Sequence, residues 1–207
     1  MDMDEYELER EASAPIDMLE QYYSALGWAF ERNGEDEIVS SFQGSWTQYE
    51  LRAIWRSEDQ VLQFLALPDV RVSAEKRAAT YETIGLINEQ LWLGHFELWS
   101  TSGLVLFRHA ALLDNDDNNG SLSLQQAETL VEAAIEECER FYPVFQFVLW
   151  ADKTPQEAIE NYQKRQKRYL VRRQHAFSIA AAWVITVPAA ATLSGLIYWA
   201  MVLLFGL

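Results

Sequence analysis

Two histidines and a nearby carboxylate have residue types and spacing that could support chemistry in this chain. A three-residue loop over Thr101–Gly103 would place His95 opposite His109 in a hairpin. Glu97 would then lie on the same face of that hairpin. Two imidazoles and a carboxylate could bind a metal ion or act as a pH switch. A third strong ligand is missing, so we expect a structural role here, with no metal and no other cofactor.

Two further features could suggest a calcium site and a reactive thiol, but neither has the residues or the surroundings that such a site requires. The stretch Asn115–Gly120 has the polar spacing of a calcium loop, but Asn115 replaces the first aspartate and Gln126 replaces the final bidentate glutamate. Cys138 is the only cysteine and lies on the apolar stripe of a glutamate-rich predicted helix. An acidic, buried setting raises a thiol pKa, so we expect Cys138 to be unreactive. No residue is predicted to be catalytic.

Six tryptophans lie between Trp28 and Trp150, which is a high number for a small domain. One interpretation is an aromatic surface that recognises a partner protein, because tryptophan is enriched in binding hot spots. The other is a small core filled with bulky side chains. The candidates for partner binding are Trp28, Trp46, Trp92 and Trp99.

Hydrophobic periodicity and turn signals predict an α+β fold, with an antiparallel sheet and flanking helices. The expected helices cover Pro15–Leu26, Ser73 to about Trp92, Ser123 to Pro143 (where the proline should kink or end it), Val144–Trp150, and a last one from Thr154. The expected strands cover Trp28–Arg32, Glu37–Gln43, Trp46–Arg56, Val61–Leu67, Phe96–Ser100 and Leu104–Leu113. Ser123 with Gln126, and Thr154 with Glu157, have the spacing of capping boxes.

Charge divides the chain sharply. All 31 acidic residues and ten of the 16 basic ones precede Lys164, which gives residues 1–163 a net charge of −21. Such an acidic body argues against a nucleic-acid partner, whose phosphates require a basic surface. The remaining basic residues form one cluster of Lys164, Arg165, Lys167, Arg168, Arg172 and Arg173.

The segment 176–207 has 32 residues without a charge, directly behind this basic cluster. A helix needs about 20 apolar residues to cross a bilayer, so we expect one C-terminal transmembrane helix. Basic residues beside a span remain on the cytoplasmic side and can contact anionic lipid, which predicts a single-pass protein of the inner membrane with its N-terminal domain in the cytoplasm. Ala191, Ser194 and Gly195 are small residues that could pack against another membrane helix.

The predicted organisation therefore has four parts. These are an acidic disordered tail (1–15), an α+β domain (16–153), a basic juxtamembrane helix (154–175) and a transmembrane anchor (176–207).

Several segments in this order resemble the YbjN family, in particular its alphaproteobacterial branch. They are Gly27–Glu31, Gly34–Ile38, Tyr49–Trp55, Leu62–Leu67, Asn88–Phe96, Leu106–His109, Glu137–Pro143 and Phe145–Trp150. The resemblance covers roughly Ile16 to Pro155. It implies a fold similar to type III secretion chaperones and a role as a sensory-transduction or stress regulator, without an established catalytic activity. The apolar tail is an addition to the pattern expected for this branch.

The first functional hypothesis is a membrane-tethered, non-catalytic, chaperone-like module that binds a protein segment at a sheet edge or apolar groove. The alternative is an accessory subunit of a membrane complex whose main contact is the C-terminal helix. An enzyme with an unfamiliar site is the third hypothesis, and it lacks a constellation of residues to support it. The expected partners are a protein and membrane lipid, and a homodimer stays open.

Overall fold

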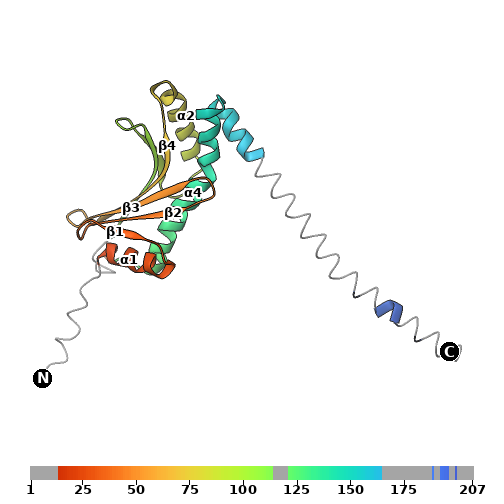
Figure 1. Cartoon of the computed structure of the whole chain (residues 1–207), viewed down its shortest axis with the longest axis horizontal. Helices are drawn as coiled ribbons and strands as arrows, with labels where there is room; N and C mark the ends of the chain where they lie inside the picture. The colour runs from red at the N-terminus through yellow and green to blue at the C-terminus, as the bar shows by residue number, and fades with distance from the viewer. Residues whose placement is uncertain (1–13, 114–120, 165–187, 189–191, 196–198, 200–207) are drawn as a thin grey trace. The chain divides into compact units, whose positions relative to one another are not determined.

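Six strands form one antiparallel sheet in the order β1-β2-β3-β4-β6-β5 in the computed structural model, which describes residues 14–113, 121–164, 188, 192–195 and 199 (Figure 1). The strands are β1 (Phe30–Arg32), β2 (Glu37–Gln43), β3 (Gln48–Arg56), β4 (Val61–Arg71), β5 (His95–Trp99) and β6 (Leu104–Leu112). Every neighbouring pair is antiparallel. The predicted α+β class with an antiparallel sheet is confirmed.

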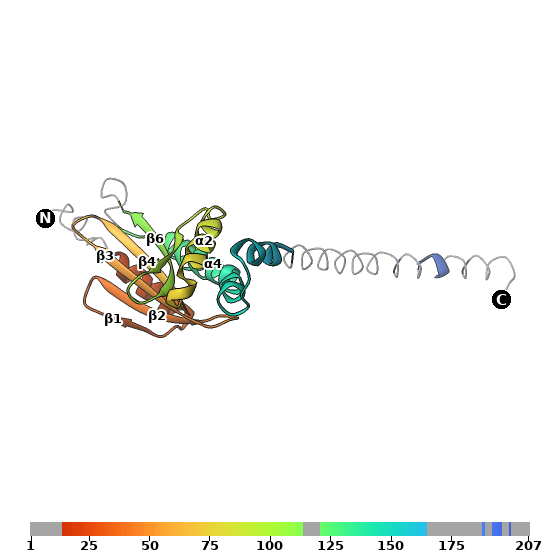
Figure 2. The ribbon, with the colours of Figure 1, turned by 90° about the horizontal axis from the view of Figure 1, so that it is seen from above.

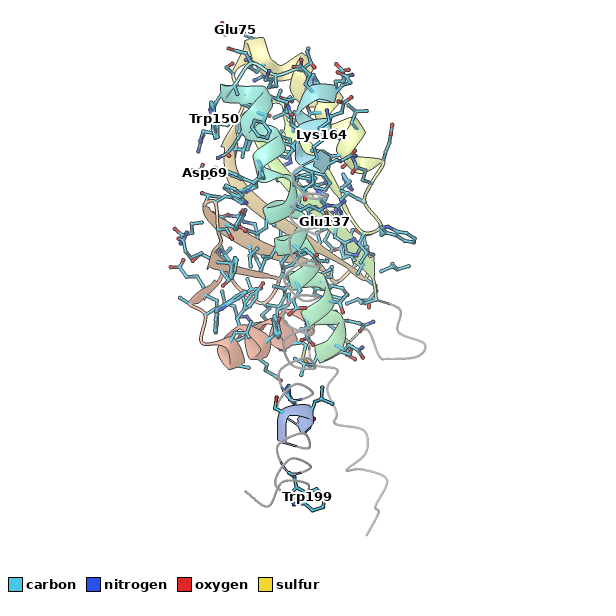
Figure 3. All side chains as sticks on the ribbon, turned by 90° about the vertical axis from the view of Figure 1, so that its right-hand side faces the viewer. Asp69, Glu75, Glu137, Trp150, Lys164 and Trp199 are labelled. Atoms are coloured by element: carbon cyan, nitrogen blue, oxygen red, sulfur yellow. The ribbon has the colours of Figure 1, made fainter. Side chains whose placement is uncertain are left out.

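Helices pack against one face of this sheet. They are α1 (Pro15–Leu26), a 3-10 turn η1 (Ala74–Lys76), α2 (Arg77–Asn88) and the long α4 (Leu124–Trp150). The helix α4 contacts β4 and β6 as well as α1 and α2, so it joins the two shorter helices (Figure 2). Figure 3 shows Glu137 near the middle of α4 and Trp150 at one end.

The alternation predicted for the third strand is present in the structure. Tyr49, Leu51 and Ala53 are fully buried against the helices, whereas Gln48 and Glu50 are exposed on the other face. Side chains of a strand alternate between its two faces, so a sheet covered on one side requires this pattern.

Strand β4 is longer than the sequence predicted. Its expected end at Pro68 is wrong, because the strand continues to Arg71. The pairing between β4 and β6 shifts register between Ala66 and Val70, and Asp69 has a φ of 51°. A bulge places the proline where no ladder hydrogen bond is required of it, which explains how the strand passes through.

Helix α2 is shorter than predicted, ending at Asn88 instead of near Trp92. The side-chain amide of Asn88 accepts a hydrogen bond from the backbone N–H of Phe96 at 2.8 Å and donates one to the Phe96 carbonyl at 3.1 Å. These contacts to β5 fix where the helix ends. The hydrophobic periodicity of the sequence does not reveal these contacts, so it could not predict where the helix ends.

Pro143 lies inside α4, which continues through it to Trp150. A proline has no N–H, so the carbonyl four residues earlier, that of Glu139, loses its helical partner. The indole Nε1 of Trp46 donates to this carbonyl at 3.1 Å, and the backbone N–H of Ser45 donates to the Glu139 carboxylate at 2.9 Å. The proline therefore creates the acceptor on which the β2–β3 turn docks.

The capping box at Thr154 is also confirmed, since Thr154 and Glu157 exchange hydrogen bonds and residues 155–164 are helical. Contacts divide the chain into Met1–Ile159 and Glu160–Leu207. Ala158 and Ile159 are buried, so the last predicted helix begins within the first unit.

Most of the predicted anchor, residues 176–207, lies outside the described residues, as do Arg165, Lys167, Arg168, Arg172, Arg173 and Ala191. Ser194 and Gly195 belong to a helical stretch at 192–195, and the ammonium of Lys164 lies 3.1 Å from the Glu160 carboxylate. In the part of the chain that is described, the structure contains no helix with the length and apolarity needed to cross a membrane.

Gly44 and Gly85 give a matched test of the docking of the β2–β3 turn on α4. A Cβ at Gly44 would overlap the Glu139 carboxylate and the Tyr49 ring, whereas a Cβ at Gly85 on α2 would meet no atom within 4 Å. Gly44→Ala should lower the free energy of unfolding by about 1–3 kcal/mol. Gly85→Ala should raise it by about 0.5–1 kcal/mol, because alanine restricts the unfolded chain. Urea unfolding of both variants checks the opposite signs, and equal effects would contradict the packing described.

Candidate functional site

An apolar pocket of about 400 Å³ lies between strand β6 and the first half of α4. The strand contributes Phe107, His109 and Ala111, all on its helix-facing side. The helix and the loop before it contribute apolar side chains that include Leu122 and Leu130. Hollows lined mainly by apolar surface, with some polar groups among the lining residues, are typical of binding sites.

The pocket exists because the two strands of the last hairpin differ in length. Strand β5 pairs with Leu104–Arg108, while β6 continues to Leu112 beside β4. The chain before β5 turns at Gly94, whose φ is 66°, and Leu93 lines the pocket. A side chain at Gly94 would overlap Phe107, so this tight turn next to β6 requires glycine.

Exposed apolar side chains adjoin the lining residues along the chain. Trp92 is 99% exposed and directly precedes Leu93, which lines the pocket, whereas Leu112 is 72% exposed but points to the open face of the sheet, away from the pocket. Leu124, at the start of α4, is also exposed. Exposed apolar side chains next to a hollow are a feature of interaction sites.

His109 is the titratable side chain of this pocket. Burial lowers the pKa of its imidazole, and the nearby charge of His95 lowers it further. The neutral form is therefore favoured, so the pocket remains apolar near neutral pH.

The predicted pairing of His95 with His109 is wrong. Trp99 pairs with Leu104, so the loop has four residues and His95 pairs with Arg108. A backbone hydrogen bond from Gly103 to the Trp99 carbonyl, 2.8 Å long, closes this wider turn.

On the open face of the sheet, Glu97 is the centre of a polar cluster. Its carboxylate accepts hydrogen bonds from the indole of Trp99 at 2.8 Å and forms an ion pair with Arg108 at 2.9 Å. The Nε2 atom of His95 lies 3.8 Å from the same carboxylate. Among the residues that the structure describes, no group of three or more His, Cys, Asp or Glu side chains could hold a metal ion.

The four candidate tryptophans lie in different surroundings. Trp28 packs between Tyr23 and Phe42, with ring centroids 5.9 and 5.2 Å away. Trp46 stacks on Tyr142 of α4. Both stabilise the docking of elements on one another, whereas Trp92 lies beside the pocket and Trp99 belongs to the Glu97 cluster. Their role in partner binding stays a prediction.

Cys138 is buried in α4, and burial raises the pKa of its thiol, with a further contribution from Glu137 and Glu139. This direction agrees with the expected lack of reactivity. The calcium-like stretch Asn115–Gly120 lies outside the described residues.

A larger groove of about 790 Å³ lies on the open face of the sheet. Its lining combines Leu67 and Leu104 with the charged side chains of Glu31, Glu50 and Arg71. Charged walls of both signs are typical of a hydrated surface, so we regard the smaller pocket as the stronger candidate site.

Sequence reasoning missed this pocket and the unpaired part of β6. The signal was present, because the strands predicted for this hairpin already differed in length: five residues against ten. What the sequence could not indicate is that α4 would cross beside the longer strand.

Substitution of His109 should change how stability depends on pH. The unfolded chain takes up a proton near the ordinary histidine pKa of 6.5, and folded His109 does so only at lower pH. The unfolded state therefore binds more protons in this window, and the free energy of unfolding falls as the pH is lowered below about 6.5. His109→Gln should flatten this part of the curve.

Urea unfolding between pH 7 and pH 5 measures the difference between wild type and His109→Gln. The control is His95→Gln, which should retain most of the slope because burial is the larger cause of the shift at His109. An unchanged slope in His109→Gln would contradict a half-buried imidazole that is held in its neutral form.

Comparison with curated proteins gives no match to this chain. Two solved structures are similar at 15% identity. The crystal structure of YbjN from E. coli has a TM-score of 0.41, covering 60% of this chain and 85% of that chain. The crystal structure of the ExsC-ExsE complex has a TM-score of 0.40, covering 60% and 88%.

The family model described as "YbjN: Putative bacterial sensory transduction regulator" matches residues 15–147. The match begins at the first residue of α1 and ends three residues before the end of α4, so it includes every strand and all the walls of the pocket. Since it also spans more than half of the sequence, the chain belongs to the YbjN family.

Proposed function

We propose that this chain is a regulatory, chaperone-like module that binds a segment of a partner protein and has no catalytic role. The observation that carries this proposal is the apolar pocket between β6 and α4, with Trp92 and Leu93 exposed next to it. Burial of such apolar surface by a partner is favourable at about 25 cal/mol per Å². The description of the family as a regulator is consistent with a protein that acts by binding.

The charge of residues 1–163, which is −21, favours a basic partner. An acidic surface accelerates encounters with basic proteins through long-range attraction. The proposed ligand therefore combines apolar side chains for the pocket with lysine or arginine.

The proposed location is the cytoplasmic face of the inner membrane, with segment 176–207 as a single transmembrane anchor. Support comes from the sequence: 32 uncharged residues follow a cluster of six basic ones. The cluster would remain on the cytoplasmic side and lie against anionic lipid. Assignment to the alphaproteobacterial branch of the family is part of the same proposal and rests on the sequence segments described above.

Trp92 and Trp150 provide a matched pair for testing partner binding. Trp92→Ala should reduce partner capture by tenfold or more, a loss of about 1.4 kcal/mol, because it removes an exposed aromatic beside the pocket. Trp150→Ala, at the far end of α4 and 60% exposed, should have no effect. The measurement is a crosslinked pull-down of the full-length chain from gently solubilised membranes, with the partner quantified by mass spectrometry.

Neither substitution should change the urea midpoint, since both side chains are exposed. Equal capture by wild type and Trp92→Ala would contradict the proposed site. A version in which an unrelated anchor replaces residues 176–207 should capture the same partner. Loss of the partner in that version would favour an accessory subunit held by its membrane helix.

The membrane topology has its own test, with a tag at each end of the chain. In intact spheroplasts, added protease should spare the N-terminal tag and remove the C-terminal one, and inverted vesicles should give the reverse. The control is residues 1–163 alone, which should not sediment with the membrane fraction. Digestion of both tags from the cytoplasmic side would show that the tail does not span the bilayer.

A further inference from the structure

The outer edge of β5 is blocked by a side chain, whereas part of the edge of β6 is not. At the outer edge, the side-chain amide of Asn88 pairs with both backbone groups of Phe96 in β5. The amide occupies the place of a peptide group from a neighbouring strand, so another strand cannot pair there. Blocking an exposed strand edge in this way prevents unwanted association.

Strand β6 has a second stretch of edge without such a block. Strand β5 ends its pairing at Arg108, while β6 remains paired with β4 as far as Leu112. Among the described residues, 109–112 are therefore paired with a strand on one side only.

The direction of the backbone groups in this stretch follows from the pairing. The backbone of Phe96 faces Asn88 and therefore points away from β6, so the Phe96–Phe107 pair is not a hydrogen-bonded one. Such pairs alternate with hydrogen-bonded pairs in an antiparallel ladder. The backbone N–H and C=O groups of Arg108 consequently point toward β5. Those of Ala110 and Leu112, two and four residues later, point to the same side.

An independent hydrogen bond fixes the same alternation. The N–H of Leu113 donates to the Gln60 carbonyl at 2.9 Å, on the β4 side. The backbone groups of Leu112 must then point away from β4, toward the unpaired edge. Among the described residues, none forms a hydrogen bond with the backbone of Ala110 or Leu112 on that side, and both residues are exposed.

A strand added at this edge would place alternate side chains on the helix-facing side of the sheet. That side holds the 400 Å³ pocket, which Phe107, Ala111 and Leu130 line. Backbone pairing and an apolar pocket thus coincide, which is the combination that strand-addition sites use for affinity and specificity.

We propose that β6 accepts an extended segment of a basic partner protein as an added strand, paired with Ala110 and Leu112, with its apolar side chains in the pocket. This inference rests on the proposed function and names its binding mode.

Charge selects the occupant of this edge. Two copies of a domain with a net charge of −21 repel each other, which disfavours pairing of β6 with β6 of a second copy. A partner segment with alternating apolar and basic residues complements the pocket and the charge of the domain.

The probe is a synthetic ten-residue peptide of alternating valine and lysine, added to the full-length chain in detergent. Ala110→Pro removes an N–H that points to the open side, so the ladder with β4 loses no bond and the fold is retained. We expect this variant to bind the peptide about tenfold more weakly, since it loses a hydrogen bond and the ring obstructs the incoming strand. Ala110→Val keeps the N–H and should bind as wild type does.

Amide hydrogen exchange, followed residue by residue by NMR, supplies the second readout. In the free protein, Ala110 and Leu112 should exchange faster than His109 and Ala111, which face β4. The peptide should slow exchange at Ala110 and Leu112. No binding by wild type, no protection at these two amides, or equal binding by Ala110→Pro would each overturn the inference.

Protection of both amides in the free protein that increases with protein concentration would show that a second copy occupies the edge, which also overturns it. The outcome for the proposed function can be read separately. If a captured partner depends on Trp92 but is unaffected by Ala110→Pro, strand addition is wrong and protein binding stands. If neither the peptide nor any partner binds, both are wrong.

Discussion

The contact between the β2–β3 turn and Glu139 of α4 is the constraint on which the rest of the fold depends. A long helix must lie across one face of the sheet, and at this point its own hydrogen-bonding pattern is interrupted by Pro143. The freed carbonyl and the carboxylate of the same residue hold Trp46 and Ser45. Because Gly44 has no side chain, the turn can approach the helix closely. One end of the sheet is thereby fixed to the middle of α4.

The position of α4 in turn determines the candidate site. With its middle held at the turn, the first half of the helix passes beside the free part of β6, and the space between them is the apolar pocket. Strand β5 is too short to fill that space, and α2 ends where Asn88 reaches Phe96. The hollow is thus a consequence of element lengths, together with the tight turn that Gly94 allows before β5. Among the described residues that line it, His109 is the titratable one, and partial burial favours its neutral form.

Much of the fold could be predicted from the sequence, because it depends on local signals. The alternation along Gln48–Arg56 and the capping box at Ser123 each depend only on residues that are close in the sequence. The predictions were wrong where a contact between residues distant in the sequence determines the end or the register of an element. Asn88 ends α2 by binding β5, a bulge allows β4 to continue past Pro68, and a wider turn shifts His95 by one position. The pocket belongs to the second group, since it depends on how α4 packs beside β6 and on how the chain turns before β5.

The closure of β5 by Asn88 also bears on stoichiometry. A sheet that is open along a whole edge can pair with one strand after another, so its complexes have no fixed stoichiometry. Here the edge of β5 is closed at Phe96, and the open stretch of β6 offers only two outward-facing residues before the strand ends. Such a short opening accommodates a single chain, so geometry limits the number of strands that can be added at β6 to one per copy. Binding at this edge would therefore saturate at a ratio of one to one.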